Sequence, residues 1–492
     1  MSRACSLLLV AGLLVAVGGC PGESPEEDGG KKPPAGEGQE EPRPDDEAKP
    51  GDGGGEEVEV KTGTPVAFGV AACTNRDPAV AGRTAVEDAV ERLGVPAKGI
   101  VFFEYFPKTI TATVTDEEGH ERQEEREVPD ADKERRLLEA VSEAAGKTPV
   151  IGCRERSLVA EGVQPADTVA VLAVGGDDVQ CRAASAKLSG DRNAVGTALA
   201  KALGGAEKLD LVVALSETGL AYDEGSGTAA ADFVRGVLGA ADGKDLVLFG
   251  GGGMPDDGAS EPGSAQFCGG KMLEGHVVAL GIAGPIALQA SHAHEFTPAE
   301  NTLKVTKSSG RWVFELDGRP AAAVYREVRG MEPDDEFTVN WQHPLGLVAG
   351  PDEVCLRMVH GEDRENGALE FATPIPEGSE VKVLFGGGDA GAVLDSAGRA
   401  VSQSFEQAGD AKPLVVLAAE SFARARRLRE FRPGGEDQLG EAIASARGEH
   451  EETPIFGFCA YGGLGPVTGE LRGRKCAYHQ HTFLSVVVTE EK

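Results

Sequence analysis

The pattern of apolar and polar positions predicts a chain in which strands and helices alternate. Apolar residues at helical spacing indicate amphipathic helices, and short runs rich in Val, Ile, Leu and Phe indicate buried strands. We expect helices at residues 83–93, 132–145, 192–203, 228–238 and 438–447. We expect strands at residues 66–71, 99–105, 168–174, 209–215, 245–249 and 454–458. The pattern therefore predicts an α/β or α+β fold, with mixed sheets packed against helices.

The last forty residues, 453–492, combine an apolar run, a glycine-rich turn and a second apolar run. Gly462, Gly463 and Gly465 follow the strand expected at 454–458, and they leave the backbone open to close approach. Residues 478–488 are expected to return as one strand that ends in a buried valine run. This arrangement is typical of the wall of a ligand pocket.

Two pairs of short segments resemble each other. The sequence T-P-V-I-G-C at 148–153 is similar to T-P-I-F-G-F-C at 453–459, and L-V-L-F-G-G-G-G at 246–253 is similar to K-V-L-F-G-G-G-D at 382–389. Self-similarity of this kind indicates internal repetition. We expect two related lobes that face each other, with Cys153 and Cys459 at equivalent places in their turns.

Two further features organise the body of the chain. Residues 109–126 are predicted to form an inserted hairpin that turns at 118–119. A domain boundary is placed near Leu316, which gives an N-terminal domain at 62–316 and a C-terminal domain at 317–492.

The N-terminus reads as a bacterial lipoprotein signal. Arg3 precedes an apolar run at 7–17 that is too short for a permanent membrane span, and Val17-Gly18-Gly19-Cys20 follows. We expect cleavage before Cys20, acylation of that cysteine and a location in the cell envelope, outside the cytoplasmic membrane. An ordinary secretory signal with a chance cysteine is the alternative, and the choice between inner and outer membrane stays open.

Acidic residues dominate the composition. Residues 21–61 are nearly all Pro, Gly, Glu, Asp and Lys, so we expect a disordered acidic tether, with a partner-binding tail as the alternative. The whole chain holds 81 acidic and 48 basic residues, a formal net charge of −33. Such a charge argues against binding to nucleic acid.

Cysteine and histidine supply the first candidate chemistry. Seven cysteines remain after Cys5 and Cys20, an odd and scattered set that does not indicate a disulfide scaffold. Cys153 and Cys459 are either reactive or small buried residues at tight turns. The pairs His292-x-His294 and His479-x-His481 would each lie on one face of a strand, and four converging imidazoles could hold zinc or copper. A shared structural or ligand-pocket role is the alternative.

The glycine loops contain no recognisable catalytic motif. Residues 250–253 lack the Gly-Lys-Ser/Thr ending of a phosphate loop, and the chain has no G-x-S-x-G elbow. Asp256 and Asp257 could bind an amine or a cation, or form a polar turn. A Cys459–His479 or Cys459–His481 pair is conceivable in a thiol-dependent hydrolase, but no third partner is evident. We expect neither catalysis nor a cofactor.

An ordered set of motifs resembles the FIST family of bacterial sensory domains. These motifs are Gly152–Cys153, G-G-G-M-P-D-D-G at 251–258, the segments within 305–325, and F-C-A-Y-G-G-L-G-P with H-Q-H-T near the C-terminus. The resemblance covers most of residues 65–488 and implies a module that senses small molecules such as amino acids. Arg154, Glu155 and Arg156 replace the family's small residues after its first turn, and Gly463 replaces a glutamate in its second.

The candidate ligand-binding residues are expected around one cleft. The two glycine turns would supply open backbone, Tyr461 and Phe267 an apolar wall, and the histidines and aspartates the orienting polar groups. Arg154 and Arg156 would either clamp a carboxylate or fill the pocket. The chain carries no evident output domain, so a signal would pass to a partner protein. The full set of candidates is Cys153, Arg154, Gly251, Asp256, Asp257, Phe267, His292, His294, Cys459, Tyr461, Gly462, Gly463 and His479.

Overall fold

The computed structural model describes most of the chain after its first sixty residues. The described residues are 63–115, 121–159, 162–216, 229–252, 265–332, 344–350, 353–371, 373–386, 389–431, 435–460, 462–466, 476–479 and 482–491. They all belong to one unit, Lys61–Lys492. The predicted signal, the acidic tether and the acylated Cys20 lie outside the described residues.

Three consecutive segments of the described chain repeat one order of elements: strand, helix, strand, one or two helices, strand, short hairpin, strand. The first repeat contains β1 (Ala67–Thr74), α1 (Pro78–Leu93), β2 (Ala97–Tyr105), α2 (Ala131–Ala145), β5 (Val150–Arg154), the hairpin β6 (Ser157–Val159) and β7 (Gly162–Val163), and β8 (Thr168–Gly175). The second contains β9 (Gln180–Lys187), α3 (Arg192–Ala202), β10 (Leu211–Ser216), α4 (Ala229–Gly239), β11 (Val247–Gly252), the hairpin β12 (Gln266–Cys268) and β13 (Lys271–Leu273), and β14 (His276–Ala283). The third contains β15 (Ile286–Ala293), α6 (Ala390–Ala408), β25 (Pro413–Ser421), α7 (Phe422–Phe431), α8 (Gly435–Ala446), β26 (Ile455–Ala460), the hairpin β27 (Gly462–Pro466) and β28 (Cys476–His479), and β29 (Phe483–Glu490).

Each repeat builds one mixed sheet with the same strand order. The orders are β1-β8-β2-β5 in sheet I, β9-β14-β10-β11 in sheet II and β15-β29-β25-β26 in sheet III. In every sheet the last strand of the repeat lies antiparallel between the first two, and the third strand is parallel to the second. The repetition therefore extends through three segments of the fold.

The hairpins are exchanged between the repeats in a cycle. The hairpin β12–β13 of the second repeat extends sheet I at β5, β27–β28 of the third extends sheet II at β11, and β6–β7 of the first extends sheet III at β26. Each hairpin covers a strand edge that would otherwise be open to pairing with another chain. The three sheets consequently depend on one another for their edges.

A glycine lies at the same register position in the third strand of every repeat. Gly152 pairs with Phe267, Gly250 with Leu464 and Gly457 with Leu158, where the large side chains come from the exchanged hairpins. A Cβ atom on Gly250 or Gly457 would lie 1.8 or 2.0 Å from a backbone carbonyl oxygen of the neighbouring strand. Only glycine fits there, which explains why the resembling segments share a glycine.

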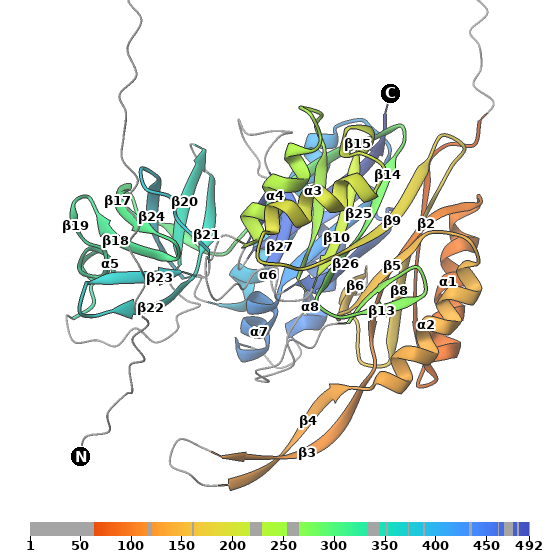
Figure 1. Cartoon of the computed structure of the whole chain (residues 1–492), viewed down its shortest axis with the longest axis horizontal. Helices are drawn as coiled ribbons and strands as arrows, with labels where there is room; N and C mark the ends of the chain where they lie inside the picture. Colours follow the sequence, from red (N-terminus) through yellow and green to blue (C-terminus); the bar gives the residue numbers. More distant parts are fainter. Residues whose placement is uncertain are drawn as a thin grey trace, which may run out of the picture. The chain divides into compact units, whose positions relative to one another are not determined.

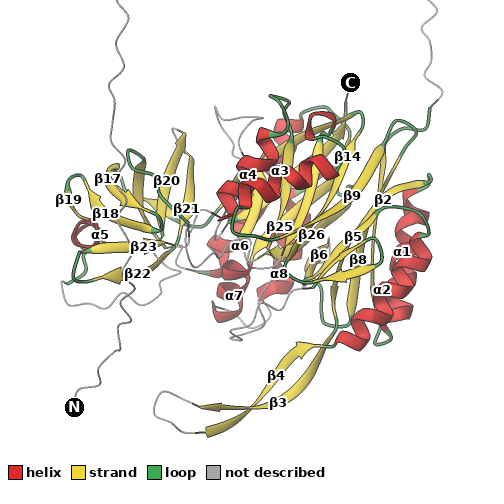
Figure 2. Cartoon of the chain, in the orientation of Figure 1, coloured by secondary structure: helices red, strands yellow, loops and turns green. Residues whose placement is uncertain are grey.

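The three sheets enclose one central apolar core, and helices cover their outer faces. Phe103 of sheet I stacks on Phe458 of sheet III with ring centroids 4.6 Å apart, and Phe249 of sheet II meets the edge of Phe458. Outer clusters form between sheet I and α1 and α2, between sheet II and α3 and α4, and between sheet III and α6 and α8. Figure 2 shows these helices outside the strands.

Two insertions interrupt the repeats. The ribbon β3 (Pro107–Thr115) and β4 (Glu121–Pro129) follows β2 and projects from the strands around it (Figure 1), which confirms the predicted hairpin. A larger insertion between β15 and α6 forms its own nine-stranded sheet with its own apolar core. Its elements are β16 (Thr297–Pro298), β17 (Leu303–Ser309), β18 (Trp312–Leu316), β19 (Arg319–Pro320), α5 (Ala321–Arg329), β20 (Leu345–Gly350), β21 (Glu353–Arg357), β22 (Val359–Asp363), β23 (Ala368–Phe371) and β24 (Glu380–Phe385).

The α/β class, with mixed sheets packed against helices, is confirmed. The similarity of 148–153 to 453–459 reflects the equivalent strands β5 and β26, and β11 is their counterpart in the second repeat. The similarity of 246–253 to 382–389 does not reflect equivalence, because β24 belongs to the inserted sheet. The domain boundary near Leu316 stays a prediction.

Two local predictions are wrong. Residues 478–488 do not form one strand: the chain leaves β28 in sheet II and enters β29 in sheet III. Cys153 and Cys459 are not equivalent, because Phe458 is an extra residue after the shared glycine. Cys153 joins the central core, and in β26 Phe458 takes that place instead of Cys459.

Candidate functional site

Three of the predicted site residues lie side by side across neighbouring strands of sheet II. Gly251 of β11 pairs with Gly463 of β27, and Gly463 pairs with His479 of β28. A Cβ atom on Gly251 would lie 2.5 Å from the carbonyl oxygen of Gly462, so any larger residue would push the two strands apart. The glycines thus allow the exchanged hairpin to approach β11 and to place His479 beside them.

His292 of β15 reaches this junction from sheet III. The ring centroids of His292 and His479 are 4.7 Å apart, with the rings tilted by 53°. Nε2 of His479 lies 3.2 Å from the carbonyl oxygen of Gly465. Because a carbonyl oxygen only accepts hydrogen bonds, Nε2 carries the proton and Nδ1 carries the lone pair.

Both imidazoles are neutral near pH 7. Burial lowers the pKa of His292 to about 4, with a hydrogen bond to the backbone of Val354 opposing the shift. Burial, and then repulsion from His292, lowers the pKa of His479 well below its usual value. Neutral imidazole is the form that accepts hydrogen bonds and binds metals.

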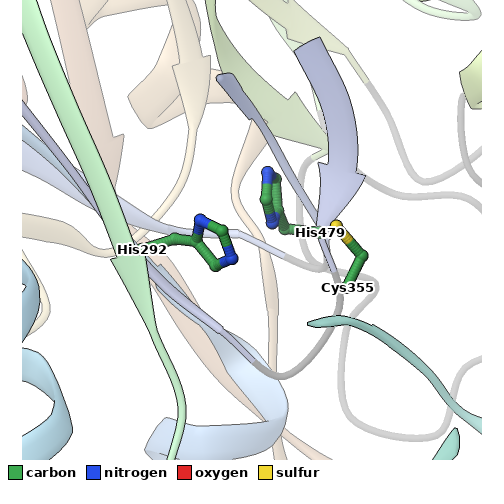
Figure 3. A group of neighbouring side chains, drawn as sticks. All are labelled: His292, Cys355 and His479. Carbon is green, nitrogen blue, oxygen red and sulfur yellow. The ribbon is translucent and has the colours of Figure 1, made fainter. Parts of the chain in front are cut away.

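A third side chain completes the cluster, and it comes from the inserted sheet. Cys355 of β21 is 3% exposed and is not part of a disulfide. Ligand atoms of His292, Cys355 and His479 all lie within 4.8 Å of one another. Figure 3 shows the ring of His292 and the sulfur of Cys355 directed toward His479.

The structure changes the predicted histidine set. His294 lies just after β15 ends at Ala293, so the alternation of a strand no longer places it beside His292. Its Nδ1 instead accepts a hydrogen bond from the backbone N–H of Phe296. His481 lies outside the described residues. The expectation of four converging imidazoles is therefore wrong for His294, and Cys355 takes a place that the sequence pattern did not indicate.

Three other predicted residues belong to sheet I and do not join this cluster. Cys153 lies in the central core, and burial raises the pKa of its thiol well above the usual value. Phe267 packs on Phe102 with ring centroids 5.3 Å apart, so it fills an outer core and forms no pocket wall. Arg154 forms an ion pair with Glu134, which accounts for its charge without a ligand.

The remaining predicted residues are placed less fully. Cys459 is buried, and its backbone N–H donates to the carbonyl oxygen of Arg156. The carbonyl oxygen of Gly462 lies against Gly251. Asp256, Asp257 and Tyr461 lie outside the described residues, so their roles stay predictions.

Two family models match consecutive parts of the chain. The FIST N domain matches residues 127–319, and the FIST C domain matches residues 321–466. The chain belongs to the FIST family. A search of curated proteins finds no match. Because FIST domains are sensory domains, the chain contains a sensory module.

Both halves of the FIST module supply the histidine–cysteine cluster and its surroundings. Gly251 and His292 lie in the FIST N region, and Cys355, Gly462 and Gly463 lie in the FIST C region. The fold extends beyond the matched residues on both sides. The first repeat begins at β1, before the FIST N match, and His479 and β29 follow the FIST C match.

Two buried groups of charged residues lie at equivalent ends of β2 and β25. Glu104 lies two residues after Phe102, which pairs with Gly152. Glu420 lies two residues after Ala418, which pairs with Gly457. Glu420 and Glu295 bind the fully buried Arg424, whose guanidinium also donates to Ser396 and to the carbonyl oxygen of Val393. No sequence signal singled out these groups.

Glu104 is less well satisfied than Glu420. It is 0% exposed, and among the described residues neither of its carboxylate oxygens has a well-aligned hydrogen-bond partner. Burial, and then the negative charge of Glu134, raises the pKa of Glu104 to about 8, against the opposing charge of Arg154. The raised pKa favours the protonated form of Glu104 near pH 7.

Two surface hollows lined by described residues lie away from the histidine–cysteine cluster. One of about 690 Å³ lies between α2 and β13, and one of about 310 Å³ lies beside α5. None of the candidate ligand-binding residues lines either hollow. Among the described helices, none has the length and apolar character needed to cross a membrane.

Proposed function

We propose that this FIST module senses a small polar solute of the amino-acid type at the junction of β11, β27 and β28, without carrying out chemistry on it. The convergence of Gly251, Gly463, His292 and His479 carries this proposal. These residues come from both family-matched regions and from the exchanged hairpin. A ligand held between them would therefore respond to the arrangement of two sheets at once.

The chemistry of the junction favours a small polar ligand. Gly251 and Gly463 let the strands approach closely and so bring polar side chains together, and a few convergent polar groups orient ligands in many sites. Each neutral imidazole keeps one unprotonated ring nitrogen, which can accept a hydrogen bond from an ammonium group. An amino acid carries such an ammonium group in a small volume.

A purely binding role is favoured over a thiol-dependent hydrolase. A catalytic cysteine reacts as the thiolate, and burial raises the pKa of Cys153 far from that form. Cys459 is buried within the strand β26. Turnover of amino-acid esters or small peptides by the purified chain would contradict this part of the proposal.

We place the module in the cell envelope, outside the cytoplasmic membrane, anchored through an acylated Cys20. The apolar run and small residues before Cys20 support this placement, and the acidic segment 21–61 would act as a spacer. The signal would then pass to a partner protein. Cys20→Ala should release the protein from the membrane fraction, and a variant that stays in that fraction would refute the anchor.

Solute binding can be tested by thermal unfolding in the presence of single amino acids. A ligand at 100 times its dissociation constant stabilises the folded protein by about 2.7 kcal/mol, which gives a measurable rise in melting temperature. His479→Ala should lose the rise, whereas His276→Ala, at the start of β14, should keep it. Because the buried histidines and Cys355 could also hold a metal ion, the screen is run on chelator-treated and on zinc-loaded protein. No shift with any amino acid or small peptide in either state would refute the proposal.

A further inference from the structure

We infer that His292, Cys355 and His479 form a binding site for one thiophilic metal ion, Zn²⁺ or Cu⁺. The three residues lie on β15, β21 and β28, which are far apart in the sequence. Their ligand atoms lie within 4.8 Å of one another and are shielded from solvent. Two imidazoles and one thiolate are a ligand set that both ions favour.

The spacing of the three side chains is close to that of a metal-bound set. With Zn–N and Zn–S bonds of about 2.0–2.3 Å, tetrahedral ligand atoms lie roughly 3.5 Å apart. Binding would thus require a contraction of about 1 Å, which side-chain rotation can supply.

The tautomer of His479 favours coordination. Its Nε2–H donates to the carbonyl oxygen of Gly465, and its buried Nδ1 has no hydrogen-bond partner among the described residues. A buried acceptor that lacks a partner destabilises the fold, and a metal ion would remove this cost. Metal-binding histidines commonly donate their other N–H to a backbone carbonyl, as His479 does here.

The charge around the cluster and the number of its ligands limit which ions fit. Arg357, two residues after Cys355, lies close enough to disfavour a proton on His479. The thiolate of Cys355 would offset one positive charge of a bound ion. Three protein ligands suit trigonal Cu⁺, or tetrahedral Zn²⁺ with one open position for water or for a donor atom of a solute.

A bound ion would connect the inserted sheet to the sheets of the repeats. Cys355 is supplied by β21 of the inserted sheet, whereas His292 and His479 belong to sheets III and II. Metal occupancy would therefore fix the inserted sheet against the junction proposed to sense a solute. Metal binding to the cluster does not depend on the proposed function, because it is measured without any solute. Only a role for the solute at this junction rests on the proposed function.

The experiment measures metal binding to the purified, reduced full chain. After treatment with a chelator, the protein is titrated with Zn²⁺ against a colorimetric chelator, and separately with Cu⁺ against a copper(I) indicator under anaerobic conditions. We expect one ion per chain in at least one titration. Cys355→Ser and His479→Ala should weaken binding by at least about 10- to 100-fold, since even outer-shell changes have effects of that size.

Matched variants make the result specific. Cys459→Ser removes another buried thiol, and His294→Ala removes the neighbouring histidine, so both should bind the ion as the natural chain does. Circular dichroism checks that every variant is folded. If Cys355→Ser does not fold, Co²⁺ added to the natural chain should give a thiolate-to-cobalt charge-transfer band.

Three results would overturn the inference. The first is binding of neither ion at stoichiometric level, and the second is equal affinity in Cys355→Ser and the natural chain. The third is a cobalt spectrum without thiolate character. Metal binding without any response to amino acids would support the metal site and contradict the proposed solute, so the two conclusions fail separately.

Discussion

Replacing Glu104 with glutamine should make the protein more stable at alkaline pH. Glu104 is fully buried near the end of β2, and its pKa is raised to about 8 by burial and by Glu134. The ordinary value is 4.5. Between these two values the folded chain holds a proton that the unfolded chain has released. The stability due to this group is therefore fully present below pH 4.5 and is lost as the pH rises toward 8.

The size of the effect follows from the shift in pKa. One pKa unit corresponds to 1.36 kcal/mol, so the carboxyl group of Glu104 can contribute up to about 5 kcal/mol between pH 4 and pH 9. Glu134 and Arg154 share the site and can rearrange, so we expect about 2–4 kcal/mol. Glutamine has nearly the same shape and does not ionise. The free energy of unfolding of Glu104→Gln, relative to that of the natural chain, should therefore rise between pH 4 and pH 9.

Urea denaturation at several values between pH 5 and pH 9 measures this difference directly. Glu104→Gln should be within about 1 kcal/mol of the natural chain at pH 5 and clearly more stable at pH 9. Glu91→Gln, on the exposed side of α1, serves as the control and should show no such trend. A difference that stays constant with pH, or that turns against glutamine as the pH rises, would mean that Glu104 is ionised in the fold and paired with Arg154.

Other predictions concern the repeats and the insertions. Gly457→Ala should cost about 3 kcal/mol or more in the free energy of unfolding, since its Cβ would lie 2.0 Å from the carbonyl oxygen of Ala418, whereas Gly239→Ala, with no atom within 4 Å, should change it by less than about 1 kcal/mol. Urea denaturation compares the two, and equal costs would contradict the steric explanation. Arg424→Met should cost about 3–5 kcal/mol because it removes an ion pair from each of two buried carboxylates, of which Glu295 keeps Arg427, and a nearly neutral effect would show that these carboxylates are protonated in the fold. Replacing residues 109–126 with a short glycine turn should leave the melting temperature nearly unchanged, because β3 and β4 pair only with each other; a large drop would show that the ribbon supports the body.

Much of the local structure could be predicted from the sequence, because its causes are local. The helix α1 begins after Asp77, whose side chain accepts a hydrogen bond from the backbone N–H of Ala79, and it ends at Gly94 in the left-handed conformation. Such signals, together with apolar spacing, place helices, strands and the ribbon within a few residues. The family resemblance, which rests on an ordered set of sequence motifs, is confirmed by the two matching family models.

What the sequence could not determine is which distant segments meet. Hydrophobic periodicity shows that a strand face is buried, but it does not show which sheet covers it. Only the tertiary structure reveals that each hairpin leaves its own repeat, so that His479 of the third repeat joins Gly251 of the second. Only the path of the inserted sheet brings Cys355 to the two histidines. The candidate site was thus half predictable: its glycines and histidines have local patterns, whereas its cysteine is placed by packing between segments that are remote in the chain.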